Sequence, residues 1–151
     1  MTRAKLITVL VVLTVLAMSS YFGGRLLHTW RRLPEAYAAW DTGTLLVVYM
    51  KSNSRWPGAW QDLFDLSTSP PQEFTLRGSS KPEWQTYVRT LPNVVSVNWD
   101  YDPRNPSGAT PVSRASGGDF PVLWDGGDPN AMVRDYLSIH ADVLPAAPAN
   151  K

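Results

Sequence analysis

The chain contains no cysteine among its 151 residues. This absence excludes disulfide frameworks, thiolate zinc sites and cysteine nucleophiles. Charge is also scarce, because 18% of the residues are charged whereas 44% are hydrophobic. Intrinsically disordered chains show the opposite balance, with low hydrophobicity and high net charge. The sequence therefore predicts a folded chain, and its length suits one ordinary domain.

Acidic residues are missing from the first 32 positions, which carry five basic side chains and a net charge of +5. The remaining residues carry 9 basic and 13 acidic side chains, a net charge of −4. Nucleic-acid binding requires basic side chains clustered on one face of a domain. Because the longer part of the chain is mildly acidic, we expect no nucleic-acid partner.

No charged residue interrupts Leu6–Gly24, a run of 19 residues rich in leucine and valine. As a helix the run is about 28 Å long, close to the roughly 30 Å of a bilayer's hydrocarbon core. The sequence therefore predicts a single-pass transmembrane helix that acts as a signal anchor. The alternative is a cleaved signal peptide, with Ala17-Met18-Ser19 as its cleavage site.

The expected domain organisation follows from this anchor. Residues 1–5 are assigned to a cytoplasmic N-terminus, 6–24 to the transmembrane helix, 25–144 to an extracytoplasmic domain and 145–151 to a flexible tail. A long domain that follows one N-terminal span is usually translocated. We therefore expect a membrane-anchored protein whose C-terminal domain is periplasmic or on the cell surface.

The pattern of apolar residues predicts an α+β domain, with a long amphipathic helix packed on a small antiparallel sheet. The three- and four-residue spacing of apolar positions predicts that this helix covers residues 34–51. Further helices are expected over 59–66 and 82–89 and from Asp128-Pro129 onward, with strands at 74–76, 94–101 and 120–124 and a loop over 105–119.

The residues that best define the beginning of this domain are Ala36, Ala39, Leu45, Leu46 and Tyr49, followed by Arg55-Trp56-Pro57 and Trp60-Gln61-Asp62-Leu63. This stretch resembles the N-terminal half of type II secretion pseudopilins and other type IV pilin-like proteins. The family's processing junction, a Gly-Phe pair followed by a Glu at the fifth mature position, has no counterpart in Met1–Leu6. The resemblance implies a structural or assembly role in secretion at the cell envelope, through protein partners or self-assembly.

Four acidic residues are candidate calcium ligands: Asp100, Asp102, Asp125 and Asp128. On a strand over 94–101, Asp100 and Asp102 point to the same side, and carboxylate oxygens are the ligands that Ca²⁺ prefers. The resemblance adds that some pseudopilins bind calcium in a loop of their C-terminal sheet. The competing interpretation is that these residues form turns and a helix cap. We expect this second role, and neither a metal nor another cofactor.

Seven tryptophans are the most unusual feature of the composition. Trp56, Trp60 and Trp99 could form a binding surface for an envelope glycan or a peptide, which would make the protein a binding module. Large aromatic side chains also build the core of a small domain efficiently. The exposure of the three rings separates these alternatives. The chain has two histidines and no recognisable catalytic motif, so we do not expect an enzyme.

Overall fold

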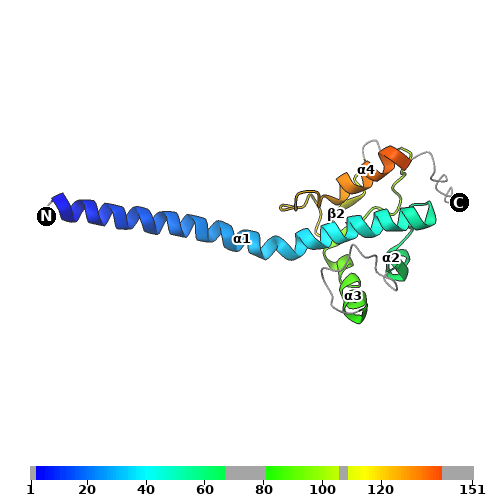
Figure 1. The fold of residues 1–151 in the computed structure, drawn as a ribbon, viewed down its shortest axis with the longest axis horizontal. Coiled ribbons are helices and arrows are strands. Elements are labelled where there is room, and N and C mark those ends of the chain that lie inside the picture. Colours follow the sequence, from blue (N-terminus) through cyan, green and yellow to red (C-terminus); the bar gives the residue numbers. More distant parts are fainter. Residues whose placement is uncertain (1–2, 67–80, 106–108, 141–151) are drawn as a thin grey trace. The chain divides into compact units, whose positions relative to one another are not determined.

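The computed structural model describes residues 3–66, 81–105 and 109–140, with side chains described except at 3–11, 25–29, 31, 81 and 82. The described residues are mostly helical, with one small antiparallel sheet (Figure 1). In chain order the elements are α1 (Arg3–Asn53), α2 (Trp60–Leu66), α3 (Lys81–Val88), the 3₁₀-helix η2 (Leu91–Asn93), β1 (Val95–Val97), β2 (Val112–Arg114) and α4 (Pro129–His140). The strand expected at 74–76 and the tail at 145–151 lie outside the described residues.

The chain divides into two compact units, Met1–Leu33 and Pro34–Lys151. Helix α1 contributes to both of them, and the boundary falls at Pro34, which lies inside the helix. Proline has no backbone N–H and therefore cannot donate the usual helical hydrogen bond to the carbonyl four residues earlier. The division between the units thus coincides with a break in the hydrogen bonding of α1.

In the first unit, α1 presents apolar side chains to its surroundings. Every residue from 12 to 22 is exposed. The large apolar side chains in this stretch are between 51% and 60% exposed: Val12, Leu13, Val15, Leu16, Met18, Tyr21 and Phe22. We call this set of seven side chains the apolar helix surface.

The predicted transmembrane helix is not found. Among the residues with described side chains, no helix is long and apolar enough to span a bilayer. For the part of the chain that the structure describes, the predictions of a signal anchor, a single membrane span and a membrane-anchored localisation are therefore wrong.

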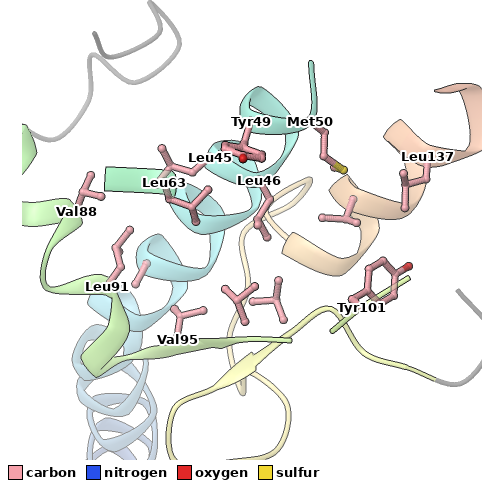
Figure 2. Packing of buried hydrophobic residues seen from close by; sticks show 14 of the residues in the cluster. Leu45, Leu46, Tyr49, Met50, Leu63, Val88, Leu91, Val95, Tyr101 and Leu137 are labelled. Carbon is pink, nitrogen blue, oxygen red and sulfur yellow. The ribbon is translucent and has the colours of Figure 1, made fainter. Parts of the chain in front are cut away.

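In the second unit, one face of α1 builds the hydrophobic core. Leu45, Leu46, Tyr49 and Met50 are buried on this face (Figure 2). Their partners come from every other described element of the unit: Leu63, Trp84, Val88, Leu91, Val95, Val97, Val112, Val133 and Leu137. The helix expected over 34–51 is therefore present, and burial of its apolar face outweighs the weak helix propensity of Val47, Val48 and Tyr49.

A small antiparallel sheet is present as predicted, and β1 occupies three residues of the strand predicted at 94–101, but its partner strand is not the predicted one. β1 stops at Val97, because Asn98 begins a turn in which its side-chain Oδ1 accepts the N–H of Asp100 and its carbonyl accepts the N–H of Tyr101. β1 pairs antiparallel with β2, which lies inside the expected loop 105–119, and Val97 is opposite Val112. The predicted strand at 120–124 is wrong. That stretch contains Pro121, which has no N–H to donate to a ladder.

The expected helix starts and stops are largely confirmed. α2 and α3 occupy the predicted short helices within one residue at each end. α4 begins at Pro129 as predicted. α1 ends at Asn53 because Ser54 adopts a φ of 53°, and its N–H closes the last turn on the Met50 carbonyl at 2.8 Å.

Polar side chains connect the elements of the second unit to one another. The Tyr87 hydroxyl on α3 donates to Asp41 Oδ2 at 2.6 Å. On β2, Arg114 Nε donates to Glu35 Oε1, and both side chains of this ion pair are largely shielded from solvent. The Asn130 side chain on α4 pairs with the backbone of Val112 in both directions, accepting its N–H at 2.9 Å and donating to its carbonyl at 3.0 Å. Asn130 therefore extends the edge of β2 in the manner of a further strand.

Gly43 on α1 lies directly against the first turn of α4. A Cβ atom built on Gly43 would lie 2.8 Å from Pro129 Cα and 3.0 Å from Met132 Sδ. The first of these contacts is with backbone and cannot be relieved by a side-chain rotation. Glycine is therefore needed at position 43 for its small size, although it is a poor helix former.

Replacing this glycine should destabilise the second unit. Gly43→Ala should lower the free energy of unfolding by about 1–3 kcal/mol, the usual cost of overpacking, despite the helix-propensity gain of about 0.5–1 kcal/mol. Urea unfolding followed by circular dichroism measures this change. Gly58→Ala is the matched control, because the nearest atom to its added Cβ is Asp62 Oδ2 at an ordinary 3.6 Å. Equal stability of Gly43→Ala and the control would contradict the close approach of the two helices.

Candidate functional site

The three tryptophans predicted as a binding surface make ring contacts in two groups, Trp60 with Trp99 and Phe64, and Trp56 with Tyr101. They come from separate parts of the chain: Trp56 from the loop after α1, Trp60 from the start of α2, and Trp99 from the turn after β1. Phe64 on α2 and Tyr101 are their ring partners. We call these five side chains the aromatic cluster.

The rings of the aromatic cluster pack against one another. Trp60 meets Trp99 edge-on, with ring centroids 5.5 Å apart and planes at 80°. Trp60 is also stacked on Phe64 at 6.1 Å, and Trp56 lies 5.0 Å from Tyr101. All three tryptophans are half-buried and border the hydrophobic core. Edge-on, half-buried rings do not form the flat exposed row that a sugar ring would stack on.

Hydrogen bonding and burial tie the cluster to the sheet. Trp56 Nε1 donates to the Asn98 carbonyl at 3.0 Å, which joins the end of α1 to the turn after β1. Tyr101 is buried, and this burial raises the pKa of its phenol above the ordinary 10.0, with Arg134 acting against the rise and Asp102 adding to it. A phenol with a raised pKa stays protonated and neutral at physiological pH, as a core residue should.

Two of the four acidic candidates, Asp102 and Asp128, accept hydrogen bonds from nearby backbone N–H groups, and the other two lie exposed in turns. Asp128 Oδ1 accepts the N–H of Asn130 at 2.9 Å, which confirms its expected place as the N-cap of α4. Asp102 Oδ1 accepts the N–H of Arg104 at 3.0 Å. Asp125 is exposed in a turn closed by the Gly127 N–H and the Trp124 carbonyl, in which Gly126 takes the φ of 71° that glycine favours. Asp100 is exposed in the turn that follows β1.

The described residues contain no group of three or more histidine, cysteine or acidic side chains that could hold a metal ion. Calcium requires six to eight oxygen ligands that converge on one point. His140 on α4 stacks on Tyr136 at 4.5 Å, and its Nδ1 lies 3.0 Å from the Tyr136 carbonyl. This histidine therefore interacts within its own helix. The side chain of His28 lies outside the described residues.

The apolar helix surface is a second candidate site, and the sequence interpretation assigned it to a bilayer. Exposed apolar patches of this kind mark sites where a protein contacts a partner. A helix that is hydrophobic on all sides is usually buried in a larger structure. These side chains are exposed and no charged residue lies among them, which together indicate a surface that contacts a partner.

Comparisons with known proteins returned no relative: no family model matches the chain, and neither a curated protein nor a solved structure is similar to it at a significant level. The resemblance to pilin-like proteins therefore stays a prediction that rests on the residues quoted for it.

If the aromatic cluster is structural, its removal should lower stability. Trp60→Ala should cost about 2 kcal/mol, less than the 3–5 kcal/mol of a fully buried tryptophan because its ring is half-buried. Chemical unfolding followed by far-ultraviolet circular dichroism measures this. Trp30→Ala serves as the control, because Trp30 is 67% exposed in the first unit and its loss should leave the transition unchanged. An unchanged midpoint for Trp60→Ala would instead favour a ligand-binding surface.

The acidic turns generate a further prediction. Asp128→Ala should lower the free energy of unfolding by about 0.5–2 kcal/mol because α4 loses its cap. Asp125→Ala, at an exposed turn position, should change it by less than about 0.5 kcal/mol. Neither calcium nor a chelator should shift the melting temperature, since a ligand that binds only the folded state must stabilise it. A saturable rise with calcium that Asp100→Ala abolishes would contradict this prediction.

Proposed function

We propose that this chain is a structural or assembly protein that acts through protein–protein contacts, as its resemblance to pilin-like proteins implies. The observation that carries the proposal is the apolar helix surface in the first unit. Seven large apolar side chains, each more than half exposed, follow one another within 11 residues of α1. Burial of such side chains against a partner contributes about 25 cal/mol for each Å² of apolar surface removed from water.

The second unit supports a role in contact rather than catalysis. The rings of Trp56, Trp60 and Trp99 pack against other aromatic rings, and the carboxylates of Asp102 and Asp128 accept backbone hydrogen bonds. The second unit holds α1 in place from residue 34 onward. That part of the helix packs into the core, Glu35 pairs with Arg114, and Asp41 accepts a hydrogen bond from Tyr87. The first unit remains available for association.

The alternative function is a binding module in which Trp56, Trp60 and Trp99 hold a glycan or a peptide. This alternative has weaker support. Trp60 and Trp99 are in contact, but they meet edge-on, Trp56 packs against Tyr101 instead, and all three rings are half-buried. The energetic contribution of such ring pairs, about 0.5–1.5 kcal/mol beyond burial, favours a structural role.

Association through the apolar helix surface can be tested with charge substitutions. Analytical ultracentrifugation of the purified full-length protein should show association that increases with concentration. The double variant Leu13→Glu, Leu16→Glu should abolish this association, because pairing would bury two uncompensated carboxylates. Ile139→Glu is the matched control, since Ile139 on α4 is 77% exposed, more than Leu13 at 60% or Leu16 at 58%. The control variant should associate as the unchanged protein does.

A partner other than a second copy is detected by crosslinking in the protein's own cells. A photo-crosslinking residue at position 16 should give a discrete product, and the same residue at position 139 should not. Either self-association or such a product, if lost in the double glutamate variant, supports the proposal. A monomer at all concentrations that gives no discrete product at position 16 would overturn it.

A further inference from the structure

We draw no further inference here: the strongest candidate, the apolar helix surface of α1 between Val12 and Phe22, carries nothing beyond the proposed function because nothing in the structure shows what covers it.

Discussion

The packing of the second unit depends on the close approach of α1 and α4 at Gly43. Any side chain at this position would meet the backbone of Pro129. With α4 held there, Asn130 reaches the backbone of Val112 and aligns β2. β2 in turn places Arg114 against Glu35, near the start of the α1 segment in this unit. The three contacts therefore connect α1 to α4, α4 to β2 and β2 back to α1. A shift of any one of these elements would disturb the other two contacts.

The hydrophobic core and the polar contacts stabilise this arrangement in different ways. Each fully buried core side chain, such as Leu45, Leu46 or Met50, contributes about 1.5–3 kcal/mol. A hydrogen bond adds about 0.5–1.5 kcal/mol net. Its geometric requirements are stricter than those of apolar contact. The pairing of Asn130 with Val112 therefore contributes less energy than the core does but determines how α4 lies against the sheet.

The aromatic cluster and the apolar helix surface differ in how far other parts of the protein shield them from water. The aromatic cluster is covered by its own members and by the core, so its tryptophans need no ligand to remove them from water. The apolar helix surface keeps more than half of each large side chain exposed. This contrast is the physical basis for the proposal that the protein associates through its first unit.

Local signals in the sequence determined the helices of the second unit. These signals are the apolar spacing over 34–51, Pro57 ahead of α2, and Asp128 ahead of Pro129, the first residue of α4. They act between near neighbours and can be recognised without a fold. The sequence located β1 within 94–101, but only the tertiary structure decided which strand pairs with it. A three-residue strand carries too little periodicity to be recognised, and β2 is defined by its distant partners Val97 and Asn130. The ring contacts of Trp56, Trp60 and Trp99 likewise depended on contacts between distant segments, which no local pattern specifies.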